Sequence, residues 1–136
     1  MDLMDLTIND FTSELGSASP APGGGSTAAL CGTLGAALCR MVAALTLDRK
    51  KYESAGPQMR DLAEKAEQIE KKLADLVDED TRAYLRVMDA FRLPKDSDQQ
   101  IHLRKAAIQD ALKAAADVPY QTLNQAAELM DLSETA

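Results

Sequence analysis

An aspartate at position 80 is the residue of this sequence best placed to do acid–base chemistry. It lies among apolar residues that recur at alternating steps of four and three, the spacing of one face of a helix. The positions of this face are Leu62, Ala66, Ile69, Leu73, Leu76, Asp80, Ala83 and Val87. A carboxylate in such a face must be hydrogen-bonded, paired or protonated, and burial raises a carboxyl pKa. A carboxyl group that titrates near neutral pH can transfer protons during catalysis.

The same position allows a structural role. Asp80 can pair with Arg40 or Arg82, or fix the register of packed helices as a polar residue in an apolar face. Asp78 and Glu79 precede it, fall on the flanking faces and are expected to contact solvent. The pattern by itself leaves both the catalytic and the structural role open.

A second candidate for chemistry is the glycine-rich stretch SPAPGGGS, residues 19–26. The glycines bring bare backbone amides to the start of a predicted helix with Ser26 as its N-cap, and a helix N-terminus of this kind suits an anion. The stretch is neither a P-loop nor a dinucleotide fingerprint, because GxxxxGK[ST] is absent and no strand precedes it. The structural alternative is a tight connection between helices in which glycine supplies a positive φ.

Other chemistry has little support. His102 stands alone among polar residues and is expected to be exposed, and no HExxH, CxxC or other ligand spacing predicts a metal site. Cys31 and Cys39 fall on one predicted helix, roughly 12 Å apart along its axis, which is too far for a disulfide. We expect two reduced, buried cysteines.

The elements that must position these residues are helices. Five aromatic residues, no tryptophan and a core of leucine, alanine, valine, isoleucine and methionine are typical of helix packed on helix. Helices are predicted over 7–15, 26–48 and 58–92, and a fourth begins near Asp96 or Ser97. Pro119 is expected to kink the fourth or to start a fifth. The sequence predicts a single all-α domain over 1–136, an antiparallel bundle of four or five helices with one long central helix.

Charge and hydropathy limit the partners. The net charge is −7, which argues against nucleic acid and against an anionic membrane surface. The second helix is apolar nearly all round and long enough to span a bilayer, but Arg40 in its middle argues against that. Asp2 and Asp5 occupy the place of a basic signal-peptide region. The basic run Arg49–Lys51 either complements the dipole of the helix it follows or binds an anion.

Three ordered blocks of the chain resemble the formiminotransferase-cyclodeaminase C-terminal domain family. They are SPAPGGGSTAALCGTLGAALCRMVAALTLDRKKYE, LVDEDTRAYLRVMDAFRLPK and RKAAIQDALKAAADVP. Together they cover about Phe11 to Pro119. The resemblance implies an all-helical cytoplasmic homodimer that binds a reduced folate and needs no metal or other cofactor. Apolar surface beyond what the bundle can hide also favours a dimer.

The activity implied by the resemblance is hydrolysis of 5,10-methenyltetrahydrofolate to 10-formyltetrahydrofolate. The sister reaction in the family is ring closure of 5-formiminotetrahydrofolate with loss of ammonia. Asp80 corresponds to the central acidic position and is the expected catalytic group. The positions expected to bind substrate are Pro22, Gly23, Gly24, Gly25, Ser26, Lys51, Tyr52, Tyr84, Arg92 and Lys95.

The substrate-binding residues have distinct expected roles. Lys51 and Arg92 are candidates for the glutamate carboxylates of the folate. Tyr52 or Tyr84 is expected to lie against its pterin or aminobenzoate ring. Lys95 belongs to the "LPK" turn of the family.

The chain departs from the family pattern in two places. Ala44 stands where members often carry an asparagine, and relatives are expected to continue past Ala136 with further helices. These departures favour an alternative to an enzyme, a non-catalytic folate-binding or helical assembly module. A purely structural bundle with one polar position in its apolar face is a second alternative, which the absence of a folate-induced rise in melting temperature would favour.

Overall fold

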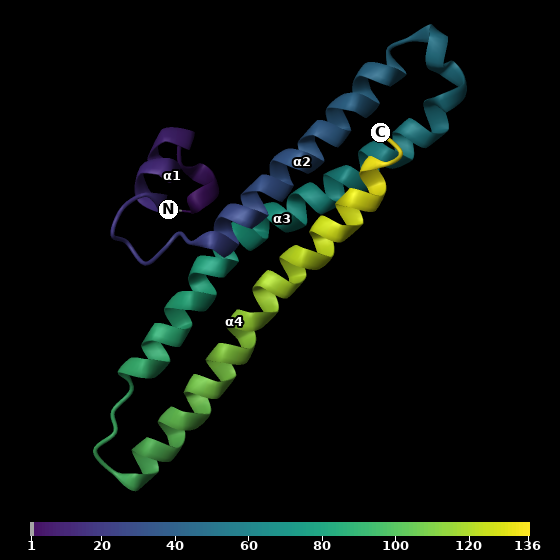
Figure 1. Ribbon diagram of the computed structural model, residues 1–136. Helices are drawn as coiled ribbons and strands as arrows, with labels where there is room; N and C mark the ends of the chain where they lie inside the picture. Colours follow the sequence, from purple (N-terminus) through teal and green to yellow (C-terminus); the bar gives the residue numbers. More distant parts are fainter. Residues whose placement is uncertain (1) are drawn as a thin grey trace.

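The structure is a computed structural model that describes residues 2–136, and over that range it consists of helices without strands (Figure 1). Its elements are η1 (Leu3–Asp5), α1 (Ile8–Leu15), α2 (Gly24–Leu47), η2 (Lys50–Ala55), α3 (Gly56–Arg92) and α4 (Asp98–Ser133). The predicted all-α class with one long central helix is confirmed. Pro119 lies inside a continuous α4, so it starts no fifth helix.

The long helix α3 is the axis of the molecule. Figure 1 shows α2 running antiparallel along the first part of α3, and α4 running antiparallel along nearly its whole length. Because α2 is shorter than α3, its N-terminus lies beside the middle of α3. The last turns of α3 and the first turns of α4 therefore project beyond α2 as a helical hairpin.

Several helix ends follow from local sequence. The side chain of Thr7 accepts a hydrogen bond from the Asp10 amide and caps α1, which ends at Gly16. Ser97 and Gln100 form a reciprocal capping box at the start of α4. These contacts join residues three positions apart, so the sequence alone predicts them.

The core lies where α2 meets the predicted apolar face of α3. All seven apolar residues of that face are buried, and Leu62 and Leu73 are completely inaccessible to solvent. The opposing surface of α2 is formed by small residues such as Ala29, Ala36 and Ala43, each with no exposed area. Small side chains let the helices approach closely, and each leucine buried there contributes roughly 1.5–3 kcal/mol.

The outer side of α2 is uncovered, although a helix that is apolar nearly all round is expected to be surrounded by other helices. Within the described residues α2 packs against α3 and, over part of its length, against α4, so it buries only the side that faces these two helices. Cys39 is buried as expected, but Cys31 is exposed on the outer side, and both thiols are free. Within the described range, α2 is the helix long and apolar enough to cross a membrane, a test that the core helix of a soluble protein also passes.

Candidate functional site

The side chain of Asp80 reaches from the middle of α3 to the N-terminus of α2. Its Oδ2 accepts a hydrogen bond from the backbone amide of Ser26 at 2.9 Å and a second from the Ser26 hydroxyl at 3.2 Å. The first amides of a helix have no partner within the helix, and its N-terminus favours negative charge. Asp80 therefore supplies an anion from another helix to the start of α2.

The contact with Ser26 replaces the N-cap role predicted for that serine. The helix begins two residues earlier, with Gly23 as N-cap, so Ser26 lies in the first turn and is fully buried. Its hydroxyl lies 3.3 Å from the hydroxyl of Thr81. Ser26 holds a neighbouring carboxylate instead of capping its own helix, because α3 passes close enough to offer one.

Position 25 requires glycine because the Asp80 carboxylate occupies the space that a side chain at this position would need. A Cβ built on Gly25 would lie 2.0 Å from Asp80 Oδ1 and 2.4 Å from its Cγ. No glycine within residues 2–136 has a positive φ, so the proposed need for a left-handed backbone is wrong. A Cβ on Gly23 or Gly24 would meet nothing within 4 Å, which leaves the backbone there open to a ligand.

A cavity of about 290 Å³ opens beside this carboxylate. It lies between the loop that precedes α2, the middle of α3 and the facing stretch of α4. Its lining consists of Pro20, Ala21, Gly23, Asp80, Thr81, Tyr84, Val87, Leu112 and Ala115. Apart from Asp80 these groups are uncharged, and the Tyr84 ring and the aliphatic side chains suit a flat heterocycle.

The structure brings together some of the predicted site residues. Asp80, Gly23 and Tyr84 line the cavity, and Gly25 and Ser26 contact Asp80. Of the remaining loop positions, Pro22 is buried and Gly24 is exposed where α2 begins.

Two predicted binding pairs lie far from Asp80 within one chain. Lys51 and Tyr52 are in η2, beyond the other end of α2, about 36 Å along that helix. There the Lys51 ammonium lies 5.5 Å from the centre of the Tyr52 ring. Arg92 ends α3 about 18 Å beyond Asp80 and pairs with Asp89 at 3.0 Å, and Lys95 follows in the loop to α4.

The arginines suggested as partners of Asp80 have other partners. Arg40 joins α2 to α3 through Glu70 at 2.7 Å, and this carboxylate raises the pKa of the guanidinium. Arg82 points to the opposite side of α3, where it pairs with Asp2 at 2.8 Å. The structural alternative of a buried Asp80–arginine pair is therefore wrong.

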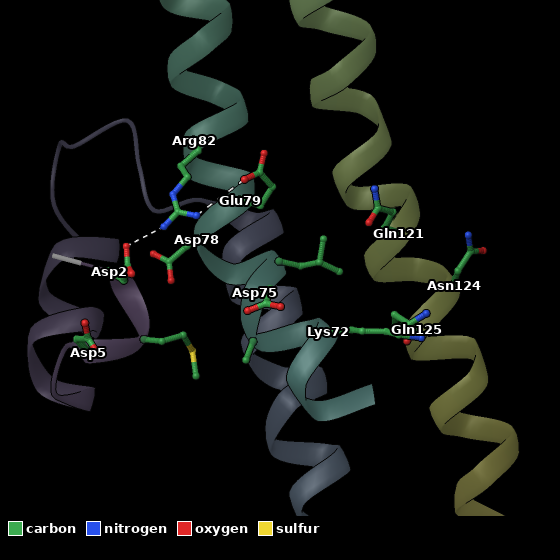
Figure 2. Close-up of a pocket in the computed structure, with 13 residues that line it drawn as sticks. Asp2, Asp5, Lys72, Asp75, Asp78, Glu79, Arg82, Gln121, Asn124 and Gln125 are labelled. Atoms are coloured by element: carbon green, nitrogen blue, oxygen red, sulfur yellow. Dashed lines mark hydrogen bonds and ion pairs between the residues drawn. The ribbon is translucent and has the colours of Figure 1, made fainter. Parts of the chain in front are cut away.

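A larger hollow of about 800 Å³ lies on the side of α3 that faces η1 and α4 (Figure 2). Figure 2 shows Arg82 between Asp2 and Glu79, with Asp5, Asp75 and Asp78 nearby and the amides of Gln121, Asn124 and Gln125 across on α4. Five carboxylates against two cations, Lys72 and Arg82, make this hollow unfavourable for a ligand with carboxylates of its own. The smaller cavity at Asp80 is the better candidate.

Four residues that line the cavity are neither predicted site residues nor part of the glycine-rich stretch: Thr81, Val87, Leu112 and Ala115. Leu112 and Ala115 lie on the apolar side of α4, Val87 belongs to the apolar face of α3, and Thr81 directly follows Asp80. The sequence could have indicated Thr81, because its hydroxyl directly follows Asp80 and is therefore expected to lie near the same cavity. No signal pointed to Leu112, because α4 contacts α3 at that point only through the tertiary fold.

No group of three or more histidine, cysteine or acidic side chains among residues 2–136 is arranged to hold a metal ion. His102 is exposed on α4, as expected.

Known proteins resemble this chain over nearly its whole length. Residues 7–136 match the family model described as formiminotransferase-cyclodeaminase. A methenyltetrahydrofolate cyclohydrolase of Methylorubrum extorquens is 41% identical over 128 residues, which are 94% of this chain and 62% of that protein. A formimidoyltransferase-cyclodeaminase of Mus musculus is 35% identical over 127 residues, 93% of this chain and 24% of that protein.

A solved structure agrees in fold. The formiminotetrahydrofolate cyclodeaminase of Thermotoga maritima superposes with a TM-score of 0.76 at 31% identity and covers 91% of this chain and 58% of that one. The chain thus spans less than two thirds of the length of each of these three relatives.

Proposed function

The chain belongs to the formiminotransferase-cyclodeaminase family, and on this premise we propose that it hydrolyses 5,10-methenyltetrahydrofolate to 10-formyltetrahydrofolate. The observation that carries the proposal is the Asp80 carboxylate, held by Ser26 at the edge of a mostly apolar cavity. The 41% identity to a methenyltetrahydrofolate cyclohydrolase supports the choice of substrate.

The proposed mechanism uses Asp80 as both base and acid. Both hydrogen bonds from Ser26 go to Oδ2, and we assign to Oδ1 the proton transfer with a water molecule in the cavity. The water oxygen bonds to the cationic methenyl carbon as Asp80 takes a proton, which passes to solvent. The bond from this carbon to N5 then breaks, N5 keeps the electron pair, and Asp80 carries the hydroxyl proton to N5. The formyl group stays on N10, and one proton is released overall.

Electrostatics favours the same arrangement. An ionised Asp80 attracts a methenyl cation, and the attraction is stronger in a partly dry cavity than in water. The Ser26 amide and hydroxyl hold the carboxylate in one orientation, so little reorganisation is needed during the reaction. The Tyr84 ring supplies a flat surface, and the Leu112 side chain an apolar one, against which a pterin ring can lie.

Hydrolysis of the bond between the methenyl carbon and N5 needs only water and proton transfer, so we propose that the enzyme uses no metal or redox cofactor. We also propose a cytoplasmic homodimer. The two free thiols fit a reducing compartment, and the exposed apolar residues of α2 fit a second copy.

Replacing Asp80 with asparagine tests the role of this carboxylate. Loss of a positioned acid–base group should lower the rate by roughly 10²–10⁴-fold, followed as loss of methenyl absorbance above the spontaneous rate. Asp75→Asn is the matched control, because Asp75 lies on the same helix and lines the acidic hollow instead. Activity of Asp80→Asn within about threefold of the parent would remove Asp80 from its proposed role.

A second candidate function is formiminotetrahydrofolate cyclodeaminase. The 31% identity to the Thermotoga maritima protein of that name favours it. Both reactions act at the same carbon and need proton transfer at nitrogen: N5 gains a proton in the hydrolysis, whereas in the ring closure N10 loses one and the formimino nitrogen leaves as ammonia. One carboxylate can therefore serve either reaction. Ammonia release from 5-formiminotetrahydrofolate, measured beside methenyl hydrolysis, decides between them, and binding of a folate without either turnover would identify a non-catalytic module.

A further inference from the structure

Thr81 makes a different hydrogen bond from the other threonines that lie inside helices of residues 2–136. The others donate their hydroxyl to the backbone carbonyl four residues earlier, the usual bond of a threonine in a helix; they are Thr12, Thr27, Thr33, Thr46 and Thr122. The Thr81 hydroxyl lies instead 3.3 Å from the hydroxyl of Ser26 on α2. A contact between two helices, and not its own helix, therefore sets the orientation of the Thr81 side chain.

We propose that Thr81 is a positioning residue for the hydrolysis and acts on Asp80 through Ser26. The inference rests on the function proposed above, in which Asp80 transfers the protons. Thr81 Oγ1 lies 3.3 Å from Ser26 Oγ, and Ser26 Oγ lies 3.2 Å from Asp80 Oδ2. We call these three atoms the oxygen row. Both of its ends belong to consecutive residues of α3, and its middle belongs to α2.

The protons of the oxygen row have one favoured direction while Asp80 is ionised. Ser26 has a single hydroxyl proton, and both Asp80 Oδ2 and Thr81 Oγ1 lie within its reach. A carboxylate can only accept, and a hydrogen bond to a charged acceptor is about twice as strong as one between neutral groups. The Ser26 proton therefore goes to Asp80, and Thr81 donates its own proton to the Ser26 oxygen.

Burial makes Ser26 depend on Thr81 as this donor. Ser26 has no exposed area, so bulk water cannot replace Thr81 at its hydroxyl oxygen. Thr81 is half-buried and lines the cavity at Asp80. In a series of hydrogen bonds each bond polarises the next, and the low dielectric of a buried site makes each one stronger. The Thr81 hydroxyl thus strengthens the bond by which the Ser26 hydroxyl holds Asp80.

The consequence for catalysis is an effect on orientation. The Ser26 amide and the Ser26 hydroxyl both donate to Asp80 Oδ2. Hydrogen bonds to such an oxygen prefer the plane of its group, so two donors to one oxygen define the plane of the carboxylate. Fixing that plane also fixes the direction of Oδ1, to which we assign the proton transfer. When the hydroxyl bond weakens, Asp80 spends less time in the reactive orientation, while the walls that bind the substrate stay in place.

Thr81→Val tests this role, because valine keeps the branched shape of threonine and lacks the hydroxyl. The kcat of methenyltetrahydrofolate hydrolysis should fall by about 3–10-fold, the equivalent of one neutral hydrogen bond, while KM stays within about twofold of the parent value. Thr81→Ser keeps the hydroxyl and should restore kcat to within about twofold of the parent. An unchanged kcat in Thr81→Val, a change in KM alone, or a Thr81→Ser variant as slow as Thr81→Val would overturn the proposal.

Thr33→Val is the matched control. It removes the same hydroxyl from a threonine of α2 that bonds only to the Ala29 carbonyl of its own helix. Its kcat should equal that of the parent. A fall in kcat as large as in Thr81→Val would show that loss of any helical hydroxyl slows the protein, and would overturn a specific role of Thr81.

A double-mutant cycle tests whether Thr81 acts through Ser26. In a Ser26→Ala background the oxygen row is already broken, so adding Thr81→Val should change kcat by less than about 1.5-fold. The same fold-loss in the Ser26→Ala background as in the parent would show that Thr81 reaches the reaction by another route, and would overturn the proposal.

Stability measures the oxygen row without any enzyme activity. In urea denaturation, Thr81→Val should lower the midpoint of the parent but not that of Ser26→Ala, where the Thr81 hydroxyl has lost its partner. Equal losses in the two backgrounds would overturn the oxygen row itself. Coupled stabilities in a protein that hydrolyses no methenyltetrahydrofolate would refute the proposed function and leave the contact of Thr81, Ser26 and Asp80 standing.

Discussion

Replacing Gly25 with alanine should dislodge Asp80 from the N-terminus of α2. The added methyl group would lie 2.0 Å from Asp80 Oδ1 and 2.7 Å from its Oδ2, well inside contact distance. The backbone of α2 is held by the packing of the whole helix against α3, whereas the Asp80 carboxylate is the end of a side chain, so the Asp80 side chain must move. When it moves, the carboxylate loses both hydrogen bonds from Ser26.

The expected cost follows from these contacts. Hydrogen bonds to a charged group contribute roughly 1.5–3 kcal/mol each, and a carboxylate that swings into solvent recovers part of that from water. We take a loss of about 3 kcal/mol for the pair, offset by about 1 kcal/mol because alanine is a better helix former than glycine. The free energy of unfolding should therefore fall by about 2 kcal/mol. Turnover should fall as far as in Asp80→Asn.

Urea denaturation followed by circular dichroism measures the effect. With a slope of about 1–3 kcal/mol per molar urea, the midpoint should move down by about 1 M at fixed protein concentration. Gly24→Ala is the control, because a Cβ there meets nothing within 4 Å, and it should leave the chain as stable as the parent or slightly more stable.

A double-mutant cycle isolates the contact between the two residues. In an Asp80→Ala background the space beside Gly25 is empty, so Gly25→Ala should no longer destabilise the protein. An equal loss of stability in both backgrounds would show that the clash with Asp80 is not the cause. Full stability and full activity of Gly25→Ala would refute the geometry on which the site rests.

Three further variants probe the same structure. Ser26→Ala removes one hydroxyl bond and should lower stability by about 1 kcal/mol and turnover more than substrate binding; an effect on KM alone would contradict a role in holding Asp80. Leu73→Ala, at a completely buried position, should cost about 2–5 kcal/mol by urea denaturation, and a cost near zero would contradict the core packing. The Lys71 ammonium lowers the pKa of Glu67, so this pair stabilises the fold above the carboxyl's usual pKa and ceases to do so as pH falls through the lowered value. Glu67→Gln should therefore be less stable than the parent at about pH 7 and as stable at about pH 2, as measured by urea denaturation. The difference at about pH 7 should vanish in high salt.

Local sequence was sufficient to predict most of the helical framework. The caps at Thr7 and Ser97, the end of α1 at Gly16 and the apolar face of α3 depend on residues three or four positions apart. Asp80 could be singled out for the same reason, because a charge at a position spaced for the core is visible in one helical repeat. The proximity of the glycine loop to Asp80 was also expected, although through the family resemblance and not through periodicity.

Which helix faces are covered could not be read from periodicity. The apolar composition of α2 fits a helix surrounded on all sides, yet the described helices cover one side of it and leave Leu34, Leu38, Met41 and Leu45 exposed. Composition reports how much surface a helix must hide, and it does not identify the neighbour that hides it.

The sequence by itself determined that the chain is helical, most of the helix ends to within about two residues, and which carboxylate enters the apolar face of α3. The tertiary structure decided that Ser26 holds Asp80, that Gly25 makes room for it, and that Lys51 and Arg92 lie far from it within one chain. The physical reason is one of range. Helix formation depends on neighbours within about one turn, whereas the meeting of two side chains depends on the offset and crossing of whole helices, which the packing of many side chains sets together.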